Sequence, residues 1–434
     1  MTALPSPRPL TLNPAWTAPT ITAVVFLVFF MCEHNLRISL ATAYTQSLDE
    51  MSVTAEGGNL LRRVMFMLLA AVGGGLTLLA LPRPWRLRLP LAMLVVAVPA
   101  WCFLSLLWAQ DFGMCTRRLI VLGCCCAGAF GVGRYFSLRE ICWMLFATTL
   151  AASFVGVTAE CVLGTFRPWS GDYRYSGSMH PNSTGIYLGA LLLSAATLSR
   201  LSPQHRWKYL AAAGWAFALL VLTKSRTATA AAIVAAGCLG MLQLRLRMQL
   251  LGAGVAVWSV AALFLVIALT GVESGSELKS LIFLGREEQA ESFTGRGEIW
   301  PQVTKNIARR PLTGYGFESF WTPDKIAEVS DEVQWAVREA HSSYLEVTLG
   351  VGLIGAGLLG LLIVTSMGAS VLEYACSGDP CFAWLVALLV FGLIDGTMES
   401  GLVTPQMVGF FLGCAFVCLA TKERPEQSTA GALA

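Results

Sequence analysis

His341 is the residue of this chain best placed to handle a proton. It is one of four histidines among 434 residues, and it stands where a long polar interval, residues 271–340, meets an apolar run. An unperturbed histidine titrates near neutral pH and can therefore serve as a general base. Capping or packing at the start of a helix is the alternative role, and position alone does not separate the two.

Basic side chains in short polar turns form a second group with chemical potential. Lys224 and Arg226 occupy Thr-Lys-Ser-Arg-Thr, which joins two apolar runs with almost no loop, and Arg296 lies between two glycines. Arginine binds phosphate through two parallel hydrogen bonds, and a helix N-terminus also favours anions. These turns predict an anion site, with anchoring at the membrane surface as the alternative. The polar interval holds twelve acidic and eight basic residues, so particular arginines must do the binding.

A third polar stretch runs from Arg167 to Tyr187 and contains Arg174 among aromatic residues, followed by His180-Pro181-Asn182. Asn182 is predicted to cap the next helix, because asparagine is favoured at that position. His180 precedes proline in an extended conformation and either lines a site or serves the loop. The candidate substrate-binding residues are therefore Arg174, Lys224, His180, Arg286 and Arg118.

The elements that position these residues are predicted to be membrane helices. The chain is 55% hydrophobic and 13% charged, with a mean hydropathy of +0.63, whereas soluble domains carry about 25% charged residues. A net charge of +3 is too small to indicate a nucleic-acid partner. Most of the 13 cysteines stand in apolar runs and none shows zinc-ligand spacing. We predict no metal, no cofactor and no disulfide framework.

Apolar stretches long enough to cross roughly 30 Å of hydrocarbon recur along the chain and predict an all-α, polytopic membrane protein of about twelve spans. They lie near 18–32, 64–81, 89–108, 117–133, 140–163, 182–198, 207–222, 227–244, 250–270, 341–366, 381–398 and 401–420. The predicted divisions are a disordered cytoplasmic tail (1–17), helices one to nine (18–270), a periplasmic loop with short helices (271–340), helices ten to twelve (341–420) and a cytoplasmic tail (421–434).

Lysine and arginine in the short loops set the predicted orientation. With the N-terminus inside, 13 basic residues fall in inner loops and tails and nine in short outer loops. Both termini are therefore predicted to be cytoplasmic. The basic residues left outside favour an anionic ligand there, with lipid headgroups the alternative reading for Arg62 and Arg63. Retention of the first span is left open, because Ala41-Thr42-Ala43 resembles a signal-peptidase site.

Gly350-Val351-Gly352-Leu353-Ile354-Gly355 has the spacing of a dinucleotide-binding loop but lies inside an apolar span, where that fold cannot form. With Gly357 and Gly360 it predicts a small-residue stripe for close helix packing. Residues 324–339 show the periodicity of an amphipathic helix lying on the membrane portion. Four carboxylates within or at the ends of the spans are functional candidates by default. They are Glu33, Glu160, Asp395 and Glu399.

These features together resemble the O-antigen ligase and polymerase superfamily of bacterial envelope glycosyltransferases, over residues 104–419 and most densely over 286–355. The ligases share a histidine followed by Asn, Ser or Gln, then nine residues, glycine, two residues and Gly, Thr or Val. His341, Ser342, Gly352 and Gly355 fit this pattern. The stretches Thr-Gly-Arg…Ile-Trp and Arg-Arg-Pro-Leu-Thr-Gly-Tyr-Gly-Phe resemble the loop signature of the superfamily.

The resemblance implies a GT-C-like enzyme of the bacterial inner membrane that takes a glycan from undecaprenyl pyrophosphate. In ligases the acceptor is lipid A–core, and in polymerases of O-antigen or exopolysaccharide it is another repeat unit. The resemblance assigns His341 as the base and Arg226 and Arg296 as catalytic residues of a metal-independent, inverting transfer. A flippase or other transporter is the competing class, disfavoured because no internal repeat is evident and the charges gather at one face.

Overall fold

The computed structural model describes residues 14–34, 60–81, 87–244, 296–333, 337–401 and 405–421, which form helices and connecting turns. Within these ranges, eleven apolar helices make up a bundle: α1 (Pro14–Glu33), α4 (Leu60–Ala80), α5 (Leu89–Leu104), α6 (Phe112–Tyr135), α7 (Leu138–Val162), α8 (Pro181–Leu201), α9 (Arg206–Leu222), α10 (Arg226–Leu242), α15 (Ser343–Ser377), α16 (Pro380–Asp395) and α17 (Met407–Thr421). The polar helices α13 (Arg296–Arg309) and α14 (Pro323–Val333) and the short 3₁₀ helices η1 (Ser105–Trp108) and η2 (Pro203–His205) join them.

Seven helices of the described residues are long and apolar enough to cross a membrane, namely α1, α4, α5 with η1, α6, α7, α8 and α15. The predicted all-α, polytopic class is therefore confirmed. A helix stands at every predicted span except 250–270, which lies outside the described residues. The total of twelve crossings and the predicted divisions of the chain stay predictions. Two of the predicted spans have different bounds in the structure. α15 runs on to Ser377, beyond the predicted end at 366, and α17 starts at Met407, after the predicted start at 401.

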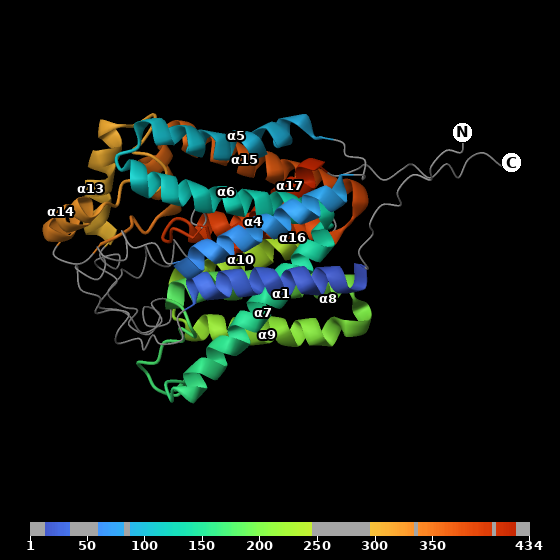
Figure 1. The fold of residues 1–434 in the computed structure, drawn as a ribbon. Helices are drawn as coiled ribbons and strands as arrows, with labels where there is room; N and C mark the ends of the chain where they lie inside the picture. The colour runs from blue at the N-terminus through green and yellow to red at the C-terminus, as the bar shows by residue number, and fades with distance from the viewer. Residues whose placement is uncertain are drawn as a thin grey trace, which may run out of the picture.

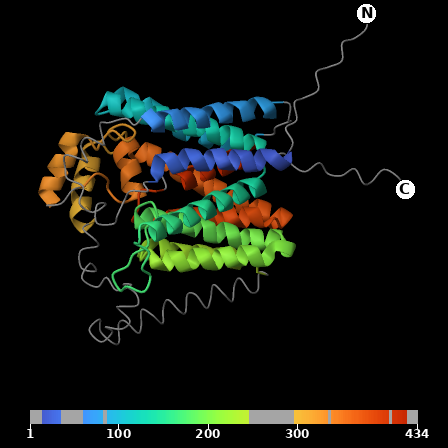
Figure 2. The same ribbon diagram turned by 60° about the horizontal axis from the view of Figure 1, so that its bottom comes forward.

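The long helices lie side by side, and α13 and α14 stand beyond one end of the bundle (Figure 1). The turned view in Figure 2 shows the same placement. Here the end that holds α13, α14 and the start of α15 is called the site end. Hydrogen bonds join other loops to it: the Ser343 amide donates to the Gly396 carbonyl (2.9 Å) and the Gln110 amide to the Tyr315 carbonyl (2.8 Å). The polar loops that carry the candidate residues thus converge.

α16 runs through the core and delivers one of these loops. Almost every residue from Cys381 to Phe391 is buried, as expected for a helix that is apolar all round. Its polar contact in the core comes from the Trp384 indole, which donates to Ser194 Oγ of α8 at 3.1 Å. A buried indole N–H needs such a partner. The rigid end of α16 therefore fixes residues 396–401, which include Glu399.

α15 is broken at Gly352, whose backbone angles (φ 70°, ψ −177°) are open essentially to glycine alone. The loop of residues 311–316 fills the break. Its Tyr315 and Gly316 amides donate to the carbonyls of Leu349 and Gly350, and its Pro311 and Leu312 carbonyls accept from the amides after the break. The polar groups freed by the break are thus satisfied inside the protein, as membrane depth requires.

The break at Gly352 bears on the small-residue stripe that the sequence predicts over residues 350–360. A Cβ on Gly352 would lie 2.1 Å from the Leu312 carbonyl oxygen, so this glycine admits a loop and not a neighbouring helix. Gly357 and Gly360 have no atom within 4 Å of an added Cβ among the described residues. The prediction of a continuous stripe for close helix packing is therefore wrong at these positions.

The predicted amphipathic helix appears as α14, which ends at Val333 and not at 339. Its buried face, with Val329 and Val333, shares a small core with Ile299 and Val303 of α13 and with Leu349 of α15. Both polar helices thus rest on the start of α15, where His341 lies.

Candidate active site

The backbone around His341 is held from several sides. His341 itself has φ 49°, a left-handed conformation uncommon for residues with a side chain. The Trp300 indole donates to the Ala340 carbonyl at 3.1 Å, and the Ala340 amide donates to the Glu346 carboxylate. On the other side, Ser343 Oγ donates to the Glu399 carbonyl at 2.7 Å. A strained residue fixed by its neighbours is frequent at functional sites.

Burial favours a neutral ring at His341. Its Nδ1 lies 3.5 Å from Glu339 Oε1, and 27% of its side chain is exposed. Burial lowers the pKa of His341 below its ordinary value, and Arg296 and Arg338 act in the same direction, while Glu339 opposes them. A neutral imidazole keeps a lone pair at neutral pH, which a general base needs. The lowered pKa of His341 agrees with the predicted role of general base.

Four side chains near His341 form one polar network that draws on two helices, α8 and α13, and on the loops that carry Arg174 and Glu399. Arg296 Nη2 lies 2.5 Å from Glu399 Oε1, and the Asn182 amide donates to the same oxygen at 2.6 Å. Asn182 Oδ1 in turn accepts from Arg174 Nη2 at 2.5 Å. Burial raises the pKa of Glu399 to about 7, and Arg296 opposes this shift. The structure thus brings Arg174 and Arg296, 122 positions apart in the printed sequence, to one carboxylate.

The role of Asn182 differs from the prediction. α8 begins at Pro181, so His180 is its N-cap, and His180 Nδ1 accepts from the Asn182 amide N–H at 3.3 Å. Proline is favoured at the first helical position, which shifts the cap one residue earlier and frees the Asn182 side chain. Part of the His180 side chain is exposed to solvent. Desolvation by the surrounding protein is the main cause that lowers the pKa of His180 to about 4, and the positive charge of Arg174 adds to it.

Lys224 and Arg226 lie in the tight turn that the sequence predicts between α9 and α10. Lys224 has φ 51°, and its ammonium group donates to the Gly171 carbonyl. Arg226 is the first residue of α10, three positions after Thr223, whose carbonyl accepts from Arg174 Nε at 2.7 Å. The turn and Arg174 therefore belong to the same corner of the site end.

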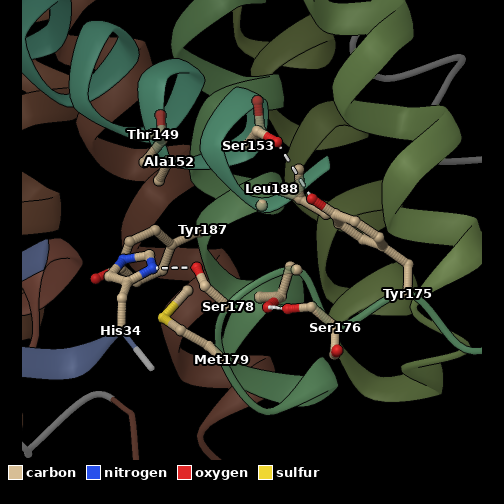
Figure 3. Close-up of a pocket in the computed structure, with 13 residues that line it drawn as sticks. His34, Thr149, Ala152, Ser153, Tyr175, Ser176, Ser178, Met179, Tyr187 and Leu188 are labelled. Carbon is tan, nitrogen blue, oxygen red and sulfur yellow. Dashed lines mark hydrogen bonds between the residues drawn. The ribbon is translucent and has the colours of Figure 1, made fainter. Parts of the chain in front are cut away.

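Glu160 holds the loop that carries Arg174. Its carboxylate accepts from the Tyr173 hydroxyl (2.5 Å) and from the amides of Ser176 (2.9 Å) and Gly177 (2.7 Å). Beside this clamp, Figure 3 shows a small cavity where His34 points at Ser178, with Nδ1 2.6 Å from Oγ. Its volume of about 10 Å³ fits one water molecule. Glu160 thus has a structural role in positioning this loop.

A larger hollow, here called the central cavity, lies between α4, α5, α6, α15 and the 317–339 region, with a volume of about 620 Å³. Arg118 lines it, and its Nη1 lies 3.4 Å from Glu318 Oε2. Arg62 and Glu339 also line it, so Arg62 faces the interior and not only lipid headgroups. The same cavity is lined by Ser183 and Ser400, the sequence neighbours of Asn182 and Glu399. Arg286 lies outside the described residues.

Residues 211–360 match the model of the family described as O-Antigen ligase. Over these residues the chain is similar to the O-antigen ligase and polymerase superfamily. A similar protein is the "Exopolysaccharide production protein ExoQ" of Rhizobium meliloti (strain 1021), 25% identical over 281 residues, which cover 61% of this chain and 62% of that protein. The match thus spans less than two thirds of that relative.

The match of the superfamily model contains Arg226, Arg296 and His341. Sequence reasoning named Glu399 among four candidate carboxylates but missed its role, and it missed Glu339 and the bridging role of Asn182. The sequence feature that pointed to Glu399 was its position as a carboxylate shortly after an apolar run. No pattern in the sequence connected it to Asn182, which lies 217 positions away.

Proposed function

We propose that the protein is a membrane glycosyltransferase that moves a glycan from undecaprenyl pyrophosphate to an acceptor hydroxyl. The observation that carries the proposal is the meeting of His341, with its neutral ring, and the network of Arg174, Asn182, Glu399 and Arg296 at one end of the bundle. A titratable base beside fixed guanidinium groups suits a reaction in which a hydroxyl is deprotonated while an anion departs.

In this mechanism the acceptor oxygen attacks the anomeric carbon of the donor glycan. The new carbon–oxygen bond forms as the bond to the pyrophosphate oxygen breaks, and the pyrophosphate leaves with the electron pair. His341 takes the hydroxyl proton, and Glu339, 3.5 Å away, stabilises the imidazolium that results. Attack from the side opposite the leaving group inverts the anomeric configuration.

Arg296, Arg174 and Arg226 are assigned to the leaving group in this proposal. Negative charge builds up on the pyrophosphate as the sugar departs, and preorganised donors aimed at that charge lower the barrier. Glu399 holds Arg296 and, through Asn182, Arg174. Because its pKa lies near 7, Glu399 can become protonated when the pyrophosphate replaces it as the partner of Arg296.

The acceptor separates two versions of the activity. Attachment of a finished glycan to lipid A–core is the ligase version, which the described family name favours. Joining of repeat units is the polymerase version, which the name of the exopolysaccharide relative favours. Deletion of the gene distinguishes them: a ligase mutant accumulates long polymer on the lipid carrier, and a polymerase mutant accumulates single repeat units.

Purified protein with a lipid-linked donor and chelator tests the chemistry itself. The proposal expects release of undecaprenyl pyrophosphate in step with glycan transfer, with chelator making no difference. Movement of the donor across a sealed bilayer without transfer would contradict it and favour a transporter.

A further inference from the structure

Glu33 and His34 stand where α1 ends, and neither has a part in the proposed mechanism. A carboxylate at the end of an apolar span is a functional candidate because it is costly to place there. Both oxygens of Glu33 are used in the structure. Oε2 accepts from the Tyr187 hydroxyl of α8, and Oε1 accepts from the Met407 amide at the start of α17 at 3.1 Å. One carboxylate thus joins α1 to two other helices.

His34 extends this connection to the loop that carries Arg174. Its Nδ1 lies 2.6 Å from Ser178 Oγ, as Figure 3 shows. The ring stacks on Phe30, with 4.5 Å between the ring centroids, and meets the Tyr187 ring edge-on. Desolvation lowers the pKa of His34 to about 4, so the ring is neutral at neutral pH. The cavity beside it has space for one water molecule. The packing therefore leaves the ring little room to turn away from Ser178.

α1 is held firmly enough to act as a fixed support. Val25, Val28 and Phe29 are fully buried. The centroid of the Phe29 ring lies 6.0 Å from that of Phe66 of α4 and 5.4 Å from that of Phe410 of α17. These contacts fix the last turns of α1 in the bundle. Side chains locked by packing can hold the residues of a site in place through hydrogen bonds.

Two of the hydrogen bonds from α1 restrain the segments that carry Arg174 and Asn182. Ser178 follows Arg174 by four positions in the same loop, and Tyr187 follows Asn182 by five positions on α8. Arg174 and Asn182 are bonded to each other, with Nη2 2.5 Å from Oδ1. Loss of either restraint would therefore affect both members of this pair.

The third hydrogen bond restrains the connection from α16 to α17, which carries Glu399. Met407 follows Glu399 by eight positions. At the other end of this connection, the Ser343 amide donates to the carbonyls of Gly396 and Glu399. α1 thus contacts segments that carry three of the four residues of the polar network, and Arg296 of α13 is the fourth.

We propose that Glu33 and His34 are positioning residues for the transfer reaction and that they hold Arg174 and Asn182 in the geometry that the leaving group needs. The inference rests on the proposed function, in which Arg174 stabilises the departing pyrophosphate. Glu33 and His34 act without touching the substrate. A shift of about 1 Å in a catalytic group can slow a reaction ~10²-fold. Because the contact gains its strength in the transition state, its loss lowers kcat more than it changes the donor KM.

Kinetics of the purified full chain in lipid nanodiscs test the role of Glu33, with an undecaprenyl-pyrophosphate-linked glycan as donor and the acceptor that supports transfer. Glu33→Leu removes both hydrogen bonds and should lower kcat ~10- to 100-fold, with the donor KM changing less than about threefold. Glu33→Gln can accept from the Met407 amide and donate to the Tyr187 hydroxyl, so it should keep at least about a third of the wild-type kcat. Thr20→Val is the matched control, because the exposed Thr20 hydroxyl donates only within α1, to the Trp16 carbonyl. It should leave kcat and KM unchanged.

His34 is tested by a similar pair of variants. His34→Leu leaves Ser178 Oγ without this partner and should lower kcat ~10- to 100-fold. His34→Asn places an amide near the position of Nδ1 and should restore most of the rate, because an amide can donate or accept.

A double-mutant cycle with Arg174 separates positioning from general destabilisation. Arg174→Gln alone should lower kcat about 30- to 1000-fold, the contribution of one contact to a developing anion. The double variant Glu33→Leu with Arg174→Gln should be at most about threefold slower than Arg174→Gln alone, because residues that act as a unit are not additive. If Glu33→Leu fails to fold, Tyr187→Phe removes one of its hydrogen bonds with little change in volume and should give the same pattern with a smaller loss.

The outcomes distinguish this inference from the proposed function. Equal losses in Glu33→Gln and Glu33→Leu would assign the effect to the charge of Glu33, on which Arg62 acts, and would overturn the positioning role. Independent, multiplying losses in the double variant would overturn it too, as would wild-type kcat in both Glu33→Leu and Tyr187→Phe. A wild-type protein that transfers no glycan, or full activity of Arg174→Gln, would contradict the proposed function itself.

Discussion

At the scale of single residues, the site depends on groups whose charge is set by their neighbours. Glu399 is 13% exposed and shares one oxygen between Arg296 and Asn182. This buried carboxylate orients the Arg296 guanidinium and the Asn182 amide at once. Removing one member of a buried hydrogen-bonded group leaves a polar atom unpaired, which is costly. Substitutions at the arginines and at His341 therefore test different parts of one connected unit.

Replacement of His341 tests the base. His341→Ala is expected to slow transfer by ~10²–10⁴-fold, the usual contribution of a positioned general base, with donor binding unchanged. His341→Gln should also fail, because an amide cannot take the acceptor proton at neutral pH. Turnover and donor binding of the purified variants provide the measurement. An active His341→Gln enzyme would show that another group is the base.

The pH dependence follows from the pKa of His341. Burial, Arg296 and Arg338 lower this pKa while Glu339 raises it, and the net shift is downward from 6.5. The neutral form is the base, so the rate should be full at neutral pH and fall only as the pH drops through the lowered pKa. A profile of kcat/KM between pH 4 and 8 checks this. An acid limb above 6.5 would assign the titration to a different group, such as Glu399.

The arginines are tested by removal and by partial replacement. Arg296→Ala and Arg226→Ala should each reduce turnover by about 30- to 1000-fold, since loss of one contact to a developing anion costs roughly 2–4 kcal/mol. Lysine at either position should rescue only part of the rate, because the guanidinium fork is lost. The measurement is the transfer rate of each variant at saturating donor. Wild-type rates in both alanine variants would exclude a role in leaving-group stabilisation.

At the scale of elements, the broken helix α15 connects the loop signature to the site. The stretch Arg-Arg-Pro-Leu-Thr-Gly-Tyr-Gly-Phe resembles the loop signature of the superfamily, and the structure gives its central part a positioning role at the break. Gly314 and Gly316 both have positive φ, which the fit of the loop against residues 349–350 requires. The loop could be found from its glycines and proline, but its docking partner could not, because the partner is backbone.

Gly352→Ala tests this junction. Its backbone region costs a residue with a side chain ~1–3 kcal/mol, and the new Cβ would meet the Leu312 carbonyl at 2.1 Å. The variant should unfold at lower temperature and lose most of its activity. Gly357→Ala, where an added Cβ has open space, is the matched control and should behave as wild type. Thermal unfolding in detergent and transfer assays measure both. Equal stability of the two variants would disprove the need for glycine at the break.

At the scale of the whole molecule, hydropathy was sufficient to predict most of the helices, because apolar length is a local property of the chain. It could not predict that Arg174, Asn182, Arg296 and Glu399 would meet, because these contacts depend on packing between distant segments. The turn at Lys224 was predictable from its short polar sequence. The central cavity was not, since its wall draws on α4, α5, α6 and α15 together.

Sidedness is the remaining prediction for the whole molecule, and two native cysteines can report on it. Cys161 is exposed in the last turn of α7, next to Glu160, which holds the loop that carries Arg174. Cys376 is exposed near the end of α15 that lies opposite the site end. Two variants that keep only one of these cysteines form a matched pair. If the site end is periplasmic, an impermeant maleimide should label Cys161 in intact spheroplasts and Cys376 only after the membrane is opened. The reverse pattern would place the site in the cytoplasm, where a donor facing the periplasm could not reach His341.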